Sequence, residues 1–131
     1  MFGDRATLIG DAAHAHGGAF ATGGSLAIDD AYAFYLALSS VFPVTATRMP
    51  SPEEIRRALR LYEATRKPHA DRLLAVVHAA NKAKAARFGT QERDEELRAR
   101  AAKGSNTIWL HEHDVVKAFD EALLGSSRAS L

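Results

Sequence analysis

The apolar positions begin as one short run and then follow a helical period over most of the chain. The run Ala6–Ile9, which Gly10 and Asp11 end, predicts a strand buried on both faces of a parallel sheet. A glycine-rich loop follows. The next helix is expected from about Thr22–Gly24 to Ser40, and its nearly all-round apolar character indicates that it is buried. Core or inter-helix packing is expected for its aromatic residues and a later tryptophan: Tyr32, Phe34, Tyr35 and Trp109.

Proline and capping residues mark the next boundary. Two prolines predict a loop over Phe42–Pro50, because neither can continue a helix. Ser51-Pro52-Glu53-Glu54 then indicates a helix start. Ser51 can act as N-cap, with Pro52 as the first helical residue, and Glu54 can return the second bond of a capping box.

A long helix with one apolar stripe is predicted after this cap. We expect it to end near Phe88, with a kink at Pro68, which removes a backbone donor. In the helix before it, Asp29 and Asp30 are expected in the early turns, where the helix dipole stabilises negative charge. The stripe consists of Ile55, Leu59, Tyr62, Leu73, Val76 and Ala80.

Two further helices are predicted beyond it. A polar one is expected over Gln91–Lys103, followed by a linker at Gly104–Asn106. The last is amphipathic and is expected to stop at Gly125. Its apolar positions are Val115, Val116, Phe119 and Leu123. The pattern therefore predicts a mostly α chain: one N-terminal strand, a glycine-rich loop and about four helices.

The single strand has a consequence for domain organisation. A parallel strand needs neighbours for its ladder hydrogen bonds, and the sequence after residue 53 is helical by pattern. We therefore expect the partner strands upstream of Met1, in a longer protein of which this is a C-terminal piece. Residues 1–25 would be the strand and loop of an incomplete domain, and residues 26–131 its helical C-terminal region.

Composition narrows the class of protein only slightly. The chain has 131 residues, enough for one domain with a core, and it has no cysteine for a disulfide or a thiolate. No apolar run approaches the roughly 20 residues of a membrane span. Asp4 and Arg5 precede a very short apolar run, so the first residues are not expected to act as a secretory signal. The lack of cysteine leaves the compartment open, and we expect a cytoplasmic protein without a membrane partner.

The charge is concentrated in the middle of the chain. Residues 53–103 carry 13 basic and 8 acidic side chains, although the whole chain has a formal net charge of +1. Basic and acidic residues alternate there, as in Arg66 and Lys67 between Glu63 and Asp71. This spacing is typical of a solvated helix face with i,i+4 pairs, and no aromatic residues are interleaved to stack bases. Nucleic acid is therefore not an expected partner.

Three blocks together resemble the FAD-dependent aromatic hydroxylases, the salicylate hydroxylase-like monooxygenases. Arg5-Ala-Thr-Leu-Ile-Gly-Asp-Ala-Ala-His14 with Asp29-Asp30-Ala31 is similar to the second flavin motif of that family. The segment Tyr62–Arg72 is similar to its Tyr-Glu-x-x-Arg-x-Pro-x-x-x-Arg helix. Trp109–Asp114 is similar to its C-terminal Trp-x-x-x-His-Asp segment. The resemblance implies the back part of an α/β FAD-binding domain followed by C-terminal helices.

The resemblance also implies a cofactor site. Asp11 would bind a ribityl hydroxyl of FAD, and backbone N–H groups around Thr22–Ser25 would face the pyrimidine edge of the flavin. His14 would have a supporting role beside the flavin loop. The residues implied are Gly10, Asp11, His14, Gly18, Ala19, Thr22, Gly23, Gly24 and Ser25. The chain departs from the family where Gly17-Gly18 replaces proline and where Ala21, Gly23 and Ser25 replace a Gly-x-Gly-x-Gly spacing.

Simpler interpretations exist for several of these residues. Asp11 could N-cap a short turn by accepting from the amides of Ala13 or His14, which is compatible with ligand binding. The pairs His14/His16 and His111/His113 suggest a metal, but nothing in the sequence brings the two pairs together, so none is expected. Ser25 lacks the context of a nucleophile.

Two functions remain from the sequence. The favoured one is part of a flavin monooxygenase that uses FAD, NAD(P)H and O₂ to hydroxylate a small aromatic or similar planar substrate. No residue in this chain is assigned as a catalytic acid or base, and the chain alone is expected to be inactive and to self-associate. The alternative is a non-enzymatic helical interaction module, whose basic helix docks a partner and whose glycine loop is only a connector.

Overall fold

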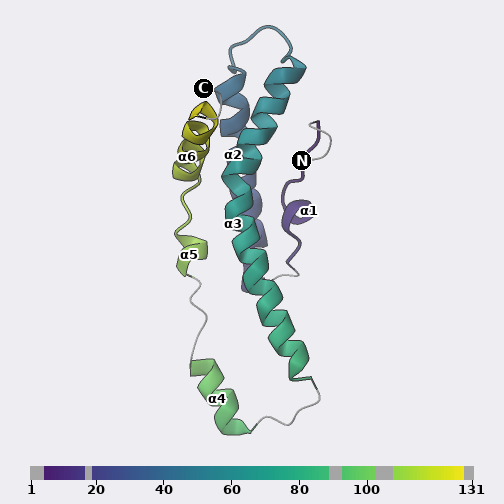
Figure 1. The fold of residues 1–131 in the computed structure, drawn as a ribbon, viewed down its shortest axis with the longest axis vertical. Helices are drawn as coiled ribbons and strands as arrows, with labels where there is room; N and C mark the ends of the chain where they lie inside the picture. Colours follow the sequence, from purple (N-terminus) through teal and green to yellow (C-terminus); the bar gives the residue numbers. More distant parts are fainter. Residues whose placement is uncertain (1–4, 17–18, 89–92, 103–107, 129–131) are drawn as a thin grey trace.

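The computed structural model describes residues 5–16, 19–88, 93–102 and 108–128, and these are mostly helical (Figure 1). The predicted mostly α fold is confirmed, and the four expected helices correspond to α2, α3, α4 and α6. The elements in chain order are α1 (Asp11–His14), the 3₁₀ turn η1 (Ala19–Ala21), α2 (Gly23–Val41), α3 (Pro52–Ala86), α4 (Asp94–Ala102), α5 (Ile108–His111) and α6 (Val115–Arg128).

The strand predicted at Ala6–Ile9 is not formed. Ala6 makes an isolated bridge, and the three residues after it have no regular secondary structure. A strand depends on ladder bonds to a neighbour, and no strand runs beside this segment in the described part of the chain. The segment lies along α3 instead, where the Tyr62 hydroxyl donates to the carbonyl of Leu8 at 3.1 Å. Leu8 and Ile9 are left 42% and 39% exposed.

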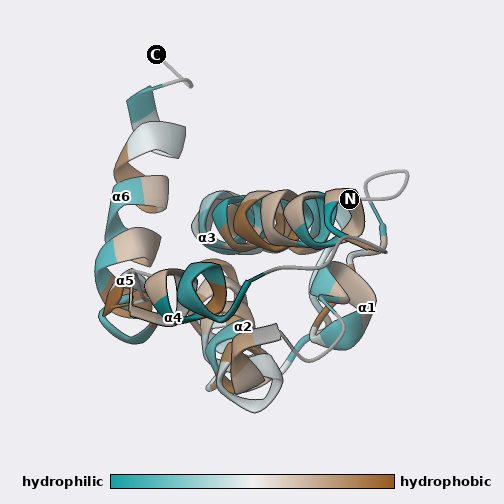
Figure 2. Cartoon of the chain, turned by 90° about the horizontal axis from the view of Figure 1, so that it is seen from below, coloured by the Kyte–Doolittle hydropathy of each residue, from teal (hydrophilic) through white to brown (hydrophobic). Residues whose placement is uncertain are grey.

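The core lies where α2, α3 and α6 meet. Figure 1 shows α2 and α3 side by side, and both views place α6 and α1 on opposite flanks of that pair (Figure 2). Towards the C-terminal end of α2 the buried cluster is Ala33, Ala37, Leu61, Tyr62, Val115 and Phe119. Near the start of α2 a second cluster joins α2, α3 and α5 through Leu26, Leu73, Val77 and Leu110. Burial of these apolar surfaces fixes α2, whose first turn is part of the predicted site.

The start of α3 follows the prediction, whereas its buried stripe differs. Ser51 accepts from the amide of Glu54 at 3.2 Å, and the Glu54 carboxylate accepts from the amide of Ser51 at 2.7 Å, so the capping box is present. The helix continues unbroken through Pro68. Its buried face departs from the predicted apolar stripe: Val77 is buried, while Val76 and Ile55 are each 37% exposed.

Two other expectations fail for geometric reasons. The face of α2 that carries Ile28, Tyr32 and Tyr35 points away from α3 and α6, so these side chains are 71%, 46% and 55% exposed rather than buried. Phe34 does pack, edge-to-face on Tyr62. Helix α6 does not stop at Gly125 but continues to Arg128, since glycine in a helix costs only about 1 kcal/mol. The predicted linker Gly104–Asn106 lies outside the described residues.

Candidate functional site

Asp30, on α2, is the centre of a buried polar cluster behind the predicted loop. It is 1% exposed. One carboxylate oxygen accepts from the amide of Gly10 and is bonded to Nε2 of His14, both at 2.7 Å. The other accepts from Nε of Arg66 at 2.8 Å. The solvated position expected for Arg66 is therefore wrong, because this side chain is 3% exposed and lies against a carboxylate.

This cluster holds the turn that carries Asp11. Gly10 has φ +61°, a conformation that suits glycine, and its carbonyl accepts from the amides of Ala13 and His14. Gly10 is thus the N-cap of α1, and Asp11 is its first residue, exposed and without a side-chain capping bond. The alternative in which Asp11 caps the turn is therefore wrong. Its carboxylate is left for another partner.

The structure brings Asp11 to the start of α2. A Cβ built on Gly23 would lie 3.7 Å from Oδ1 of Asp11 and 4.0 Å from Cε1 of His16. A Cβ on Gly24 would meet nothing within 4 Å, so the first turn of α2 is open on that side. The first amides of a helix have no intrahelical acceptors, and Thr22 provides no side-chain cap to them. A carboxylate and a donor-rich helix start therefore lie together, as the sequence predicted.

The remaining predicted residues occupy the approach to this turn. Thr22 is buried, and its carbonyl accepts from the amide of Leu26 and from the hydroxyl of Ser25 at 2.9 Å. Ala19 begins the turn η1, and Gly18 lies outside the described residues. The two residues before Thr22, Phe20 and Ala21, both have positive φ, of 61° and 53°. Non-glycine residues adopt this conformation only where the surroundings hold it.

His16 is a site residue that the ligand prediction did not include. It is 8% exposed, and neither ring nitrogen has a hydrogen-bond partner among the described residues. Its ring is nearly parallel to that of His14, with centroids 6.3 Å apart. His16 thus lies between the Asp30 cluster and the first turn of α2. The His-x-His spacing was visible in the sequence, but its burial depends on the packing of α2.

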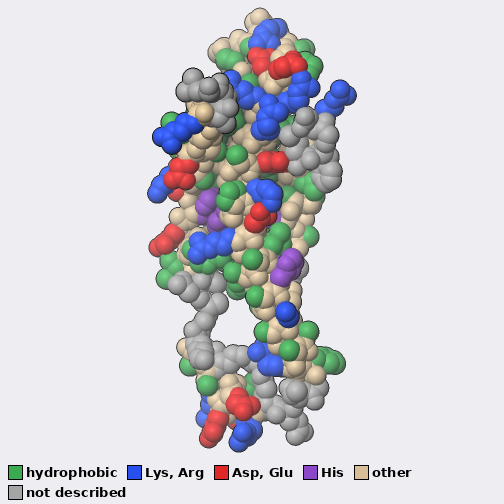
Figure 3. Space-filling view, in the orientation of Figure 1, with side chains coloured by type: hydrophobic (Ala, Val, Ile, Leu, Met, Phe, Trp, Pro, Cys, Tyr) green, Lys and Arg blue, Asp and Glu red, His purple; other side chains and the backbone are tan. Residues whose placement is uncertain are grey.

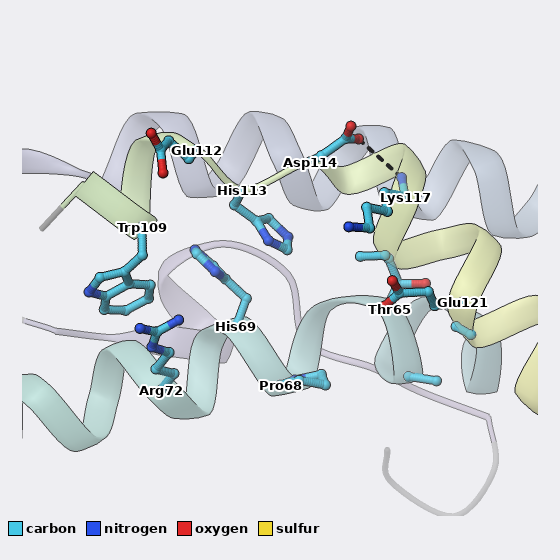
Figure 4. A pocket seen from close by; sticks show the side chains of 13 residues that line it. Thr65, Pro68, His69, Arg72, Trp109, Glu112, His113, Asp114, Lys117 and Glu121 are labelled. Atoms are coloured by element: carbon cyan, nitrogen blue, oxygen red, sulfur yellow. Dashed lines mark hydrogen bonds between the residues drawn. The ribbon is translucent and has the colours of Figure 1, made fainter.

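A separate cavity lies between α3 and the α5–α6 segment. It has a volume of about 560 Å³, and none of the residues predicted for the flavin lines it. Figure 4 shows His69, from α3, and His113 facing each other inside it, with Arg72 beside Trp109. The two imidazole rings are stacked with centroids 3.9 Å apart, and the guanidinium of Arg72 lies 4.0 Å from the Trp109 ring centroid.

Both histidines in this cavity are held in their neutral form. Burial, reinforced by His113 and then by Arg66 and Arg72, lowers the pKa of His69 to about 4. Burial also lowers the pKa of His113, with Arg66 contributing. Desolvation and neighbouring positive charge both disfavour the imidazolium. The cavity therefore contains neutral hydrogen-bonding rings at ordinary pH.

The surface outside these sites carries charges of both signs. Figure 3 shows Lys and Arg interspersed with Asp and Glu on the face that it displays. Several of these charges form ion pairs, including the i,i+4 pair Lys67–Asp71 at 2.5 Å. The described residues contain no group of three or more histidine or acidic side chains placed to hold a metal. Nor does any described helix combine the length and apolar character that crossing a membrane requires.

The comparison with known families assigns the chain to one of them. The sequence matches the FAD binding domain family over residues 1–77, which include Asp11, the start of α2 and the buried Asp30–Arg66 pair. This match spans more than half of the chain, so the chain belongs to the FAD binding domain family. No match was found among curated proteins or among solved structures.

Proposed function

We propose that this chain holds the flavin of an NAD(P)H-dependent monooxygenase that hydroxylates a small aromatic or similar planar substrate with O₂. The observation that carries the proposal is the exposed carboxylate of Asp11 beside Gly23, at the open first turn of α2. A polyhydroxylated chain attached to a ring with partial negative charge at its edge fits such a pair. The carboxylate accepts from hydroxyls, and the helix start favours partial negative charge.

The residues present fit FAD by their own chemistry. Asp11 would hold a ribityl hydroxyl, and the amides of Gly23, Gly24 and Ser25 would face the oxygen and nitrogen atoms of the pyrimidine edge. Gly24 leaves room for this approach, since a Cβ there would occupy open space. When bound, the flavin supplies electron transfer from NAD(P)H and the activation of O₂.

The buried cluster behind the site holds the binding residues in place and takes no part in the reaction. Asp30 holds Gly10 and His14, and Arg66 neutralises Asp30, so the turn bearing Asp11 stays fixed relative to α2. Preorganisation of this kind lowers the cost of ordering the site when a ligand binds. None of these residues is assigned a proton-transfer role in the proposal.

The flavin site takes up only part of the chain. In this proposal residues 1–25 contact the flavin and residues 26–131 form the helical region of the same domain. The exposed faces at Leu8–Ile9 and at Ile28, Tyr32 and Tyr35 would pack against further parts of a longer protein. The isolated 131-residue chain would accordingly be inactive.

Measurements on the full-length protein that contains this chain test the function directly. Purified from cells, it should carry the visible absorption of bound flavin, and planar aromatic acids and phenols should stimulate its oxidation of NADH or NADPH. Hydroxylated product should form in parallel with O₂ consumption. A colourless protein to which FAD does not bind would contradict the proposal, and flavin without any hydroxylation would contradict the monooxygenase part alone.

One observation favours the alternative, a helical interaction module. Ile28, Tyr32 and Tyr35 form an exposed apolar face on α2, and the rings of the two tyrosines are stacked with centroids 6.4 Å apart. Such a face suits a protein partner as well as a missing part of the same domain. In such a module, substitution of Tyr32 and Tyr35 by Ser should abolish binding of the protein partner, and the unsubstituted protein should carry no flavin.

A further inference from the structure

Buried polar atoms without partners carry a free-energy penalty in a folded protein. Both ring nitrogens of His16 are in this state among the described residues, although the side chain is more than nine-tenths buried. His14, two residues earlier, has Nε2 bonded to Asp30. Because an unsatisfied buried donor or acceptor is costly, a ligand that supplies the missing partner gains affinity at that position.

The position of His16 indicates what that ligand group is. Its Cε1 lies 4.0 Å from the point where a Cβ on Gly23 would be, and Oδ1 of Asp11 lies 3.7 Å from the same point. The imidazole and the carboxylate therefore converge on the first turn of α2. A neutral imidazole offers one donor and one acceptor.

We propose that His16 is a further ligand-binding residue, whose imidazole exchanges a hydrogen bond with a hydroxyl of the polyol chain that Asp11 also binds. This inference rests on the proposed function, because the polyol is the ribityl chain of the flavin. A hydroxyl both donates and accepts, so it satisfies either tautomer of His16. Asp11, being a carboxylate, only accepts. The two residues together therefore recognise a chain of hydroxyls rather than a single anion or cation.

A comparison of riboflavin with lumiflavin distinguishes a direct contact of His16 with the ligand from a general stabilisation of the loop by His16. The two share the isoalloxazine ring, but lumiflavin has a methyl group in place of the ribityl chain. Flavin-free full-length protein is titrated with each, following the quenching of flavin fluorescence. In His16→Phe the Kd for riboflavin should rise about tenfold, the effect of one buried hydrogen bond, while the Kd for lumiflavin changes less than about twofold. His16→Asn, which retains a donor and an acceptor, should recover part of the riboflavin affinity.

A control and a measurement without substitution keep the outcome interpretable. His111→Phe, at an exposed position on α5, should change neither Kd. A second measurement uses the wild-type protein labelled with ¹⁵N-histidine and so does not depend on the stability of the variants. The ¹⁵N chemical shift of a His16 ring nitrogen should change when riboflavin binds and stay unchanged when lumiflavin binds. Equal weakening of both flavins in His16→Phe, or equal ¹⁵N shifts with both, would overturn the inference and leave the proposed function standing. Failure of the wild-type protein to bind either flavin would overturn both.

Discussion

Nε of Arg66, on α3, lies 2.8 Å from Oδ1 of Asp30, on α2, and both side chains are almost fully buried. A second, longer contact of 3.7 Å joins the same guanidinium to Asp29. The opposite oxygen of Asp30 holds Gly10 and His14, so the ion pair connects the α2–α3 core to the turn that carries Asp11. The stability of the fold and the geometry of the ligand site thus depend on the same carboxylate.

Loss of the charge on Asp30 should destabilise the protein strongly. Asp30→Asn leaves the guanidinium of Arg66 buried without its counter-ion, and breaking a buried pair costs about 3–5 kcal/mol. Urea unfolding measures the change. Lys67→Met is the matched control, because Lys67 is adjacent in sequence but forms an exposed pair with Asp71, which contributes about 0.3–0.5 kcal/mol. Equal effects of the two substitutions would show that the buried pair does not hold the fold.

The two neutral histidines between α3 and α6 should make stability depend on pH. The pKa of His69 falls from its ordinary 6.5 to about 4 on folding, so the unfolded chain binds the proton more tightly. The contribution of His69 leaves the free energy of unfolding at its full value above about pH 6.5. As the pH falls towards 4, this contribution lowers the free energy of unfolding by up to about 3 kcal/mol. His113 has a lowered pKa and acts in the same direction.

Urea unfolding at a series of pH values measures this dependence. In His69→Leu the decline between pH 6.5 and 4 should be markedly shallower than in the wild type. His78→Leu, an exposed position on the same helix, should retain the wild-type slope. A wild-type stability that is flat over this interval, or that rises as the pH falls, would contradict the burial of neutral imidazoles.

A side chain at Gly24 should separate folding from ligand binding. A Cβ there meets nothing within 4 Å, and glycine is a poor helix former, so Gly24→Val should not lower the thermal stability of the flavin-free protein. The branched side chain would, however, block the approach of a ligand to the amides of α2. Flavin affinity should fall by at least tenfold in a titration. Gly125→Val, at an equally open helical position on α6, should leave that affinity unchanged.

The helices could be predicted well from the sequence because the residues that mark where a helix begins lie close together in the chain. The cap at Ser51 and Glu54 depends on residues three apart, and the structure reproduces both of its hydrogen bonds. The approach of Asp11 to Gly23 also followed from local order, since a carboxylate and a glycine-rich helix start are joined by one short loop. The family match shows that the chain belongs to the FAD binding domain family, while the site and the roles of its individual residues stay predictions.

The parts that were missed depend on contacts between distant segments. Arg66 was placed on a solvated face, because its partner Asp30 is 36 residues away and no local pattern reveals a buried ion pair. One signal was present: Arg66 and His69 fall on the same helical face as Tyr62 and Leu73, both of which are buried. The exposure of Tyr32 could not be read from α2, whose apolar residues surround the helix on all sides.

The 131-residue chain by itself should associate with other copies of itself. Leu8, Ile9, Ile28 and Tyr35 are large apolar or aromatic side chains that it leaves between 39% and 71% exposed. Water-exposed apolar faces of this kind favour association, and we expect a helix-rich, marginally stable product that binds FAD weakly or not at all. Sedimentation velocity and circular dichroism test this. A monodisperse monomer that melts cooperatively and binds FAD tightly would show that nothing further is needed to complete the site.

The central claim is that Asp11 and the first turn of α2 bind the flavin, and the retention of FAD by Asp11→Ala in the full-length protein tests it most directly. Loss of a hydrogen bond to a charged group should weaken binding by about 1.5–3 kcal/mol, seen as a rise in Kd of roughly tenfold to 150-fold. Asp120→Ala, at an exposed position on α6, is the control. Unchanged flavin content after extensive dialysis, with the fold intact by circular dichroism, would remove Asp11 from the site and contradict the account.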